Sequence, residues 1–283
     1  MNLTDLSCVR DIMQRHGIAP QKRYGQNFLI NPTVVARIAD TCADREAGVI
    51  EIGPGIGTLT RELSPRFRKV VALEIDTSLI PVLGETLGDL DNVKVINADA
   101  MKTDLAALVK EEFDGMPVYV CANLPYYITS PIVMSLLESG GIFEAVTVMI
   151  QKEVADRFCA VAGSTDYGAI TLAVNYYSEA EKCFNVAPGN FMPPPKVTSS
   201  VIRMNIRKEP PVPVRDSENM FRIIKYAFAC RRKTLVNALC TLSPKCGKGE
   251  VIRTLEKLGY DPNIRGERLA LSDYACISDE LTV

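Results

Sequence analysis

Short apolar runs rich in β-branched residues alternate with longer amphipathic stretches from about residue 48 to residue 206. The runs are typical of buried strands and the stretches between them of helices, so the pattern predicts a mostly parallel sheet covered by helices on both faces. The expected strands are GVIEIG, KVVALEID, NVKVINAD, VYVCANL, AVTVMIQ, AEKCFNV and TSSVIRMNI. The last two are joined by the irregular, proline-rich APGNFMPPPK, so we expect them to pair as a terminal antiparallel hairpin.

The alternation of strand-like and helix-like segments ends at residue 207. The proline-rich segment KEPPVPV that follows is predicted to be a stiff linker. Beyond it, apolar residues recur at helical spacing at Ile223, Ile224, Ala227, Phe228, Leu235, Val236 and Leu239. Gly259 predicts the end of a second helix, and Ser272 with Asp273 predicts the start of a third. We therefore expect an α/β domain over 1–207 and a small all-helical domain over 214–283.

Two further segments have an apolar character. The uncharged stretch 115–137 is long enough to span a bilayer, but its three prolines make it a poor membrane helix. A strand, a loop and a helix are the expected elements there. The segment up to Gly17 spaces charges through an apolar pattern, which predicts an amphipathic surface helix and not a signal peptide.

The numbers of cysteine and histidine residues argue against a disulfide-bonded protein and against a metalloprotein. Nine cysteines form an odd set without any Cys-x-x-Cys pair, so we expect reduced thiols and a cytoplasmic protein. A single histidine and the lack of a dense ligand cluster argue against a protein-bound metal.

The charge is unevenly distributed along the 283 residues. The formal net charge of −2 shows no basic footprint for a nucleic-acid partner. Over residues 203–283, however, 15 Lys and Arg stand against 10 Asp and Glu, whereas the preceding residues carry 17 against 24. A basic tail on an acidic α/β domain is the pattern of a binding surface confined to one part of the molecule.

The segment EIGPGIG at 51–57 follows an apolar strand and precedes a helix. Glycines such as Gly53 and Gly55 at such a turn let the backbone approach a cofactor closely. Glu74 and Asp99 end the next two predicted strands, where a carboxylate can accept ribose hydroxyls and an adenine amino hydrogen, respectively. A merely structural glycine turn and solvated strand-end acids are the alternatives. The lack of a Gly-Lys-Ser/Thr loop disfavours a nucleoside triphosphate.

The following strand ends in NLPY at 123–126. The exocyclic amine of adenine is a poor nucleophile, so its site needs hydrogen-bond acceptors for both N–H groups and an aromatic face for the base. The Asn123 side-chain oxygen with the Leu124 or Pro125 carbonyl can be the acceptors, and Tyr126 can stack on the base. The alternative for this segment is an ordinary Asn-x-Pro turn.

Several motifs occur together and in order: QNFL at 26–29, EIGPGIG at 51–57, NLPY at 123–126, NFMPPPKV at 190–197 and RRKTL at 231–235. With them the chain resembles, over nearly its whole length, the ribosomal RNA adenine-N6,N6 dimethyltransferases of the bacterial small-subunit, kasugamycin-sensitivity type. The resemblance implies a Rossmann-like α/β methyltransferase fold with S-adenosylmethionine as methyl donor. The implied substrate is a pair of adjacent adenosines in the 3′-terminal hairpin of 16S rRNA in the small ribosomal subunit. We expect the enzyme to act as a monomer.

The resemblance also assigns site residues. It places Asn27 and Leu29 at the methionine end of the cofactor, Gly53 over its carboxylate, Glu74 at the ribose, Asp99 with Ala100 at the adenine, and Asn123 between cofactor and target. The implied mechanism is in-line displacement at the sulfonium methyl without a covalent enzyme intermediate. Phe191 would stack on the face of the flipped adenine opposite Tyr126, or else serve as a hydrophobic anchor of its loop.

Basic residues of the tail are the candidate phosphate contacts, or else a solvated face. They are Arg231, Arg232 and Lys233, expected on one helix, with Arg222, Lys225, Arg265 and Arg268 nearby in sequence, and Lys22 and Arg23 before the QNFL motif. The closest rival function is a large-subunit rRNA methyltransferase of the macrolide-resistance type, which Leu124 and the triple proline disfavour without excluding. A non-catalytic ribosome-assembly or transcription factor would have lost the glycine loop, and a small-molecule methyltransferase has no use for the basic tail.

Overall fold

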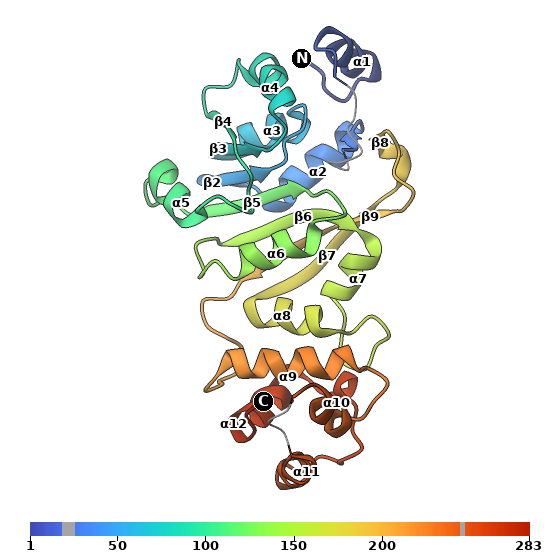
Figure 1. Ribbon diagram of the computed structural model, residues 1–283. Helices are drawn as coiled ribbons and strands as arrows, with labels where there is room; N and C mark the ends of the chain where they lie inside the picture. Colours follow the sequence, from blue (N-terminus) through green and yellow to red (C-terminus); the bar gives the residue numbers. More distant parts are fainter. Residues whose placement is uncertain (19–25, 244–246) are drawn as a thin grey trace. The chain divides into compact units, whose positions relative to one another are not determined.

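The computed structural model describes residues 1–18, 26–243 and 247–283 (Figure 1), so the predicted contacts Lys22 and Arg23 lie outside the described residues. Its main sheet has seven strands in the order β4-β3-β2-β5-β6-β9-β7. The strands are β2 (Asp44–Ile52), β3 (Phe67–Glu74), β4 (Val93–Asn97), β5 (Val118–Asn123), β6 (Ala145–Gln151), β7 (Ser178–Val186) and β9 (Ser199–Ile206). The five strands from β4 to β6 pair in parallel, and β9 runs antiparallel to β6. The predicted mostly parallel sheet is thus confirmed, with the last two long strands adjacent at one edge.

The strand order creates a switch point in the middle of the sheet. From β2 the chain moves outward through β3 and β4, and then returns to the other side of β2 with β5 and β6. Loops that leave β2 and β5 therefore diverge and leave a crevice at the carboxyl ends of these strands, which is where open α/β sheets bind ligands.

Helices cover the sheet because its central strands are apolar on both faces. In β2, every residue from Ala47 to Ile52 is buried, as a parallel strand between two helical layers requires. Val49 of β2 packs in one cluster with Val35 of α2 and Leu59 of α3. The helices of this part are α1 (Leu6–Arg15), α2 (Pro32–Cys42), α3 (Thr58–Leu63), α4 (Ile80–Leu87), α5 (Leu105–Phe113), α6 (Thr129–Leu137) and α7 (Lys152–Phe158), with short 3₁₀ turns at η2 (Ser64–Arg66), η3 (Thr77–Leu79) and η4 (Pro188–Asn190).

A second, two-stranded sheet joins two motifs that are far apart in the sequence. Strand β1 (Phe28–Leu29) pairs antiparallel with β8 (Phe191–Met192). Next to it, the Asn31 side chain donates a hydrogen bond of 2.7 Å to the side-chain oxygen of Asn190. This sheet was not predicted, because two-residue strands carry no periodic signal.

The amphipathic helix predicted before Gly17 is confirmed as α1. Its apolar side chains Val9 and Ile12 are buried in one cluster with Ile56 of the glycine loop and Leu79. No helix in the described part of the chain is long and apolar enough to cross a membrane.

The chain forms two compact units whose boundaries differ from those expected. The first comprises Met1–Ala155 with Glu179–Ile206, and the second Asp156–Ser178 with Arg207–Val283. The expected division into 1–207 and 214–283 placed residues 156–178 with the α/β domain. Instead, Tyr167 and Leu172 of that segment are buried in the same core as Ile223 of the tail.

The second unit is helical, as predicted for the tail. Its helices are α8 (Ala169–Tyr177), α9 (Ser217–Ala229), α10 (Leu235–Leu242), α11 (Lys248–Lys257) and α12 (Leu271–Glu280), with the 3₁₀ turn η5 (Gly266–Arg268). Figure 1 shows α9 beside α10 and α12. One expectation was wrong: Arg231, Arg232 and Lys233 are not on a helix but in the turn between α9 and α10, because α9 ends at Ala229.

Candidate active site

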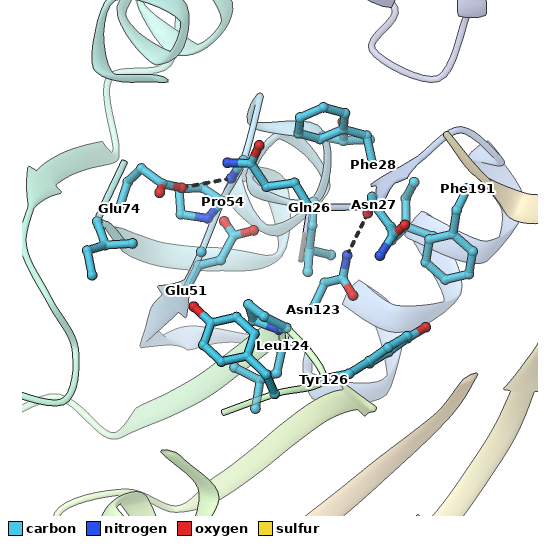
Figure 2. A pocket seen from close by; sticks show the side chains of 18 residues that line it. Gln26, Asn27, Phe28, Glu51, Pro54, Glu74, Asn123, Leu124, Tyr126 and Phe191 are labelled. Carbon is cyan, nitrogen blue, oxygen red and sulfur yellow. Dashed lines mark hydrogen bonds between the residues drawn. The ribbon is translucent and has the colours of Figure 1, made fainter. Parts of the chain in front are cut away.

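A cleft of about 850 Å³, including the part open to solvent, lies at the carboxyl ends of β2, β3 and β5. In the view of Figure 2, Glu74 and Pro54 lie on one side of it, Tyr126 and Phe191 on the other, and Asn123 between them. Its lining residues are Gln26, Asn27, Phe28, Leu29, Glu51, Gly53, Pro54, Gly55, Thr58, Leu59, Glu74, Ile75, Asn123, Leu124, Pro125, Tyr126, Tyr127 and Phe191. The QNFL, glycine-loop and NLPY motifs therefore meet in one place, at the switch point of the sheet.

The glycine loop requires glycine for two different reasons. Gly53 has a φ of +71°, and a Cβ atom added there would meet no heavy atom within 4 Å, so its open side adjoins the cleft. Gly55 has a φ of +62°, and a Cβ atom there would come within 3.2 Å of the Phe28 ring. Gly53 thus leaves room for a ligand, whereas Gly55 leaves room for the packing of the QNFL segment.

The Glu74 carboxylate is held in place by backbone donors. Its Oε2 accepts a hydrogen bond of 3.2 Å from the Gly55 N–H, and its Oε1 accepts one of 2.8 Å from the Asp76 N–H. The Asp76 carboxylate in turn accepts a hydrogen bond of 3.0 Å from the Gln26 side chain. Burial raises the pKa of Glu74 although these N–H donors oppose the shift. These bonds fix the Glu74 carboxylate at the end of β3 as an acceptor for hydroxyl groups.

Glu51 is a feature of the cleft that our sequence prediction missed. The residue is 1% exposed, and its Oε2 has no hydrogen-bond partner in the part of the chain that the structure describes. Burial, together with the nearby Glu74 charge, raises the pKa of Glu51 to about 8. An acid inside an otherwise apolar strand was the available signal, because a buried charge is costly unless something compensates it.

We predict that replacing Glu51 by glutamine removes a pH dependence of folding stability. Because folding raises the pKa of Glu51 from 4.5 to about 8, the folded state favours the protonated acid. The free energy of unfolding of the cofactor-free wild type should therefore fall, relative to that of E51Q, as the pH rises from about 5 through 8. Urea unfolding between pH 5 and pH 9 measures this difference.

The exposed Glu46 on the same strand provides the matched control. The E46Q variant should follow the wild type at every pH. If the difference between E51Q and the wild type did not change with pH, Glu51 would not be the buried acid described above.

Asn123 ends β5 with its side chain in the cleft. Its Nδ2 donates a hydrogen bond of 3.3 Å to the Asn27 carbonyl, as the dashed line in Figure 2 shows. This contact assigns the amide nitrogen to Asn27, so that Oδ1 is the atom available as an acceptor. The Leu124 N–H donates 3.1 Å to the Met149 carbonyl of β6, which anchors the motif to the sheet.

The two candidate backbone acceptors of the NLPY motif differ. The Pro125 carbonyl already accepts hydrogen bonds from the Ile128 N–H at 3.3 Å and the Thr129 hydroxyl at 3.1 Å. These bonds close the turn that leads into α6. The Leu124 carbonyl is therefore the better candidate for the second acceptor, and Pro125 serves to shape the turn.

The two aromatic candidates also differ in accessibility. Tyr126 is partly buried and lines the cleft. Phe191 lines the cleft as well, but it is only 3% exposed and packs in the same cluster as Leu29, Met149 and Val201. In this arrangement Tyr126 presents the more accessible ring, and Phe191 anchors the β1–β8 sheet.

Asp99 and Ala100 do not reach the lining of this cleft. They follow β4, and the N–H of Ala98 beside them donates 3.0 Å to the Glu74 carbonyl. Asp99 accepts a hydrogen bond of 3.0 Å from the Met101 N–H, and its carboxylate lies 3.7 Å from the Lys102 ammonium. The two residues are thus next to the β3 end of the site but outside the enclosed space.

The basic residues of the second unit occupy distinct environments. The Arg231 guanidinium lies 2.7 Å from Glu267 and donates 2.9 Å to the Thr165 carbonyl, so it ties three segments together. Arg232 and Lys233 are exposed. Arg222 and Lys225 are exposed on α9, and Arg265 and Arg268 are exposed around η5. Within the RRKTL motif, Arg231 therefore has a structural role in the turn between α9 and α10.

The lining of the cleft defines the charge of a suitable ligand. It includes two buried acids, Glu51 and Glu74, and none of its described residues is Lys or Arg. Across residues 1–18, 26–243 and 247–283, no group of three or more His, Cys, Asp and Glu side chains could hold a metal ion. A cationic organic ligand suits such a cleft better than a phosphorylated nucleotide does.

Comparison with known proteins decides the family. The model of the ribosomal RNA adenine dimethylase family matches residues 19–269. The chain belongs to the ribosomal RNA adenine dimethylase family. The ribosomal RNA small subunit methyltransferase A of Geobacillus thermodenitrificans is 46% identical to this dimethylase over 276 residues, which are 96% of this chain and 94% of that protein.

Two solved structures share the fold. A dimethyladenosine transferase from Plasmodium falciparum superposes on this dimethylase with a TM-score of 0.73 at 26% identity, over 88% of this chain and 95% of that one. The 23S rRNA methyltransferase ErmE superposes with a TM-score of 0.68 at 29% identity, over 90% of this chain and 99% of that one. The predicted Rossmann-like methyltransferase fold is confirmed.

Membership of the family also confirms the predicted chemistry. The protein is an S-adenosylmethionine-dependent methyltransferase that dimethylates adenine in ribosomal RNA. The two alternative functions, a non-catalytic factor and a small-molecule methyltransferase, are set aside because the family model and the curated relative are both those of ribosomal RNA methyltransferases.

Proposed function

We propose that the protein dimethylates the N6 amines of two adjacent adenosines in the 3′-terminal hairpin of 16S rRNA, within the small ribosomal subunit. The observation that carries this proposal is the fixed amide of Asn123, whose nitrogen is bonded to the Asn27 carbonyl while its oxygen remains as an acceptor in the cleft. The similarity to small-subunit methyltransferases supports this RNA as the substrate. Such a substrate supports a cytoplasmic location, where the protein would act as a monomer.

The residues of the cleft fit the cofactor. S-adenosylmethionine carries a sulfonium and an ammonium cation. Both acids of the cleft suit this charge, because a nearby cation lowers the raised pKa of Glu51, whose Oε2 has no partner among the described residues, and favours the carboxylate form of Glu51 and of Glu74. We assign the methionine end to Asn27, Leu29, Gly53 and Gly55, the ribose to Glu74, and the adenine to Asp99 and Ala100 beyond the enclosed part. When bound, the cofactor supplies an activated methyl group.

The chain's own residues orient the acceptor amine. The Asn123 Oδ1 and the Leu124 carbonyl accept the two N6–H bonds, which draws the nitrogen lone pair out of conjugation with the ring and toward the methyl donor. The Tyr126 ring holds the flipped base by stacking, and Phe191 supports the β1–β8 side of the site. No residue needs to act as a base before transfer, because the amine becomes acidic only once it carries positive charge.

The direct test supplies the protein with a labelled methyl donor and undermethylated ribosomal subunits. Small subunits should incorporate label into two adjacent adenosines as N6,N6-dimethyladenosine, which mapping of the digested RNA detects. Large subunits serve as the parallel substrate. Label that appeared only in large-subunit RNA would replace the proposed substrate by that of the macrolide-resistance type, and no incorporation into either RNA would contradict the proposal.

We predict that Arg232 and Lys233 of the basic turn bind RNA phosphate, whereas Arg231 is held by Glu267. Neutralising Arg232 and Lys233 together (R232Q/K233Q) should weaken RNA binding several-fold and lower the salt slope of binding by about 1 for each phosphate that these side chains neutralise in the wild type. Cofactor affinity should not change. Titration of RNA at several salt concentrations measures both effects.

Two controls separate charge from structure. The K257Q variant removes a lysine of α11 that is paired with Glu280 at 2.6 Å, and it should keep the wild-type salt slope. The R231Q variant should lower the melting temperature, because Arg231 holds Glu267 and the Thr165 carbonyl. An R232Q/K233Q protein with unchanged RNA affinity would remove this turn from the binding surface.

A further inference from the structure

The Tyr126 hydroxyl is bonded to a residue far away in the sequence. It lies 2.8 Å from the Ser199 Oγ, and the two positions are 73 residues apart. Ser199 is the first residue of β9, is 0% exposed, and does not line the cleft. The bond therefore reaches from the loop after β5 to a strand that is separated from β5 by β6.

The neighbouring serine on the same strand has a different partner. Ser200 is also 0% exposed, but its hydroxyl lies 2.6 Å from the Asn185 side-chain oxygen of β7. Successive side chains of a strand point to opposite faces, so only Ser199 is directed toward the NLPY loop. The two adjacent serines thus have the same burial and the same kind of bond, but only one of them touches the cleft's aromatic residue.

A tyrosine ring that follows a strand end can rotate about two side-chain bonds. Fixing its hydroxyl restricts that rotation, and a stacking ring held in one orientation loses less conformational freedom when the base arrives. Packing at the cleft wall restrains the ring only in part, because Tyr126 is partly buried.

We propose that Ser199 is a positioning residue for methyl transfer, whose hydroxyl holds the Tyr126 ring in the orientation that stacks on the target adenine. The proposal rests on the proposed function, because it requires an adenine in this cleft. Ser199 itself touches neither the base nor the cofactor.

Single and double substitutions of the pair test this role. The S199A and Y126F variants each remove one partner of the bond, and each should lower kcat by about threefold to tenfold, the size expected of one hydrogen bond. The S199A/Y126F protein should be no slower than either single variant, because both single variants already abolish the same bond. S199T, which keeps a hydroxyl, should recover most of the rate.

A spectroscopic readout separates positioning from stability. An RNA that carries 2-aminopurine at the target position reports stacking through quenching of its fluorescence. Quenching should be weaker with S199A and Y126F than with the wild type. The matched control S200A loses the bond to Asn185, so it should lower the melting temperature while leaving kcat and quenching unchanged.

Several outcomes would overturn the proposal. They are wild-type kcat in both S199A and Y126F, additive losses in the double variant, or an S200A protein that loses as much rate and quenching as S199A. A wild-type protein that methylated no adenosine would instead contradict the proposed function. The activity of the wild type is therefore measured first, so that the two kinds of failure can be distinguished.

Discussion

Replacing Asn123 by alanine should lower kcat by about 10²- to 10³-fold, the loss typical of removing one preorganised polar contact to a reacting group. The Asn123 Oδ1 is oriented before any substrate arrives, because its amide nitrogen donates 3.3 Å to the Asn27 carbonyl. Without that acceptor, one N6–H bond stays conjugated with the ring and the amine remains a poor nucleophile. Single-turnover methylation at saturating cofactor and RNA measures the loss.

Asn97 is the matched control for this substitution. It ends β4 as Asn123 ends β5, and its Nδ2 donates 2.7 Å to a backbone carbonyl, that of Glu74, but it does not line the cleft. The N97A variant should therefore keep kcat within about threefold of the wild type, because the hydrogen bond that it loses does not contact the reacting groups. An N123A protein that was as active as N97A would remove Asn123 from the reaction.

Replacing Gly53 by alanine should weaken cofactor binding by at least about tenfold, equivalent to about 1.4 kcal/mol. The added methyl group would meet no protein atom within 4 Å, so it would occupy space beside the cleft rather than disturb the fold by contact. The φ of +71° at this position adds backbone strain of about 1–2 kcal/mol in a residue other than glycine. Calorimetric titration with the cofactor measures the affinity.

Gly115 is the control position that separates the effect of backbone strain from that of a methyl group in the cleft. Its φ is +75°, and a Cβ atom there also meets no heavy atom within 4 Å, but Gly115 follows α5 and does not line the cleft. G115A should therefore lose about as much stability as G53A and keep wild-type cofactor affinity. Equal losses of affinity in both variants would show that strain, and not the methyl group in the cleft, accounts for the effect.

The outcome at Phe191 and Pro125 shows where sequence reasoning is limited. The resemblance left two roles for Phe191, a face for the flipped adenine or a hydrophobic anchor. Its exposure of 3% and its packing against Leu29 across the β1–β8 pair favour the anchor. Pro125 was a candidate acceptor, but the turn into α6 uses its carbonyl. Which groups a fold leaves accessible depends on how other segments pack around them, and one motif does not contain that information.

The tail shows the same limit at the level of domains. Apolar periodicity predicted its helices but assigned 156–178 to the α/β domain, because that segment follows the sheet pattern in the chain. Tyr167 and Leu172 nevertheless pack with Ile223 of α9. Likewise the basic run at 231–233 continued a helical pattern, whereas α9 ends at Ala229 and Arg231 is drawn to Glu267.

The sequence by itself determined the order of the seven long strands, the chemical group at the end of several of them, and the methyltransferase family, because periodicity and motif spacing are local properties of the chain. Only the tertiary structure decided which groups meet. The bonds of Gln26 to Asp76, Asn123 to Asn27 and Tyr126 to Ser199 join positions 50 to 96 residues apart. Such pairs depend on the strand order, which brings the ends of β2, β3 and β5 to one edge of the sheet, and a buried group such as Glu51 acquires its raised pKa only there.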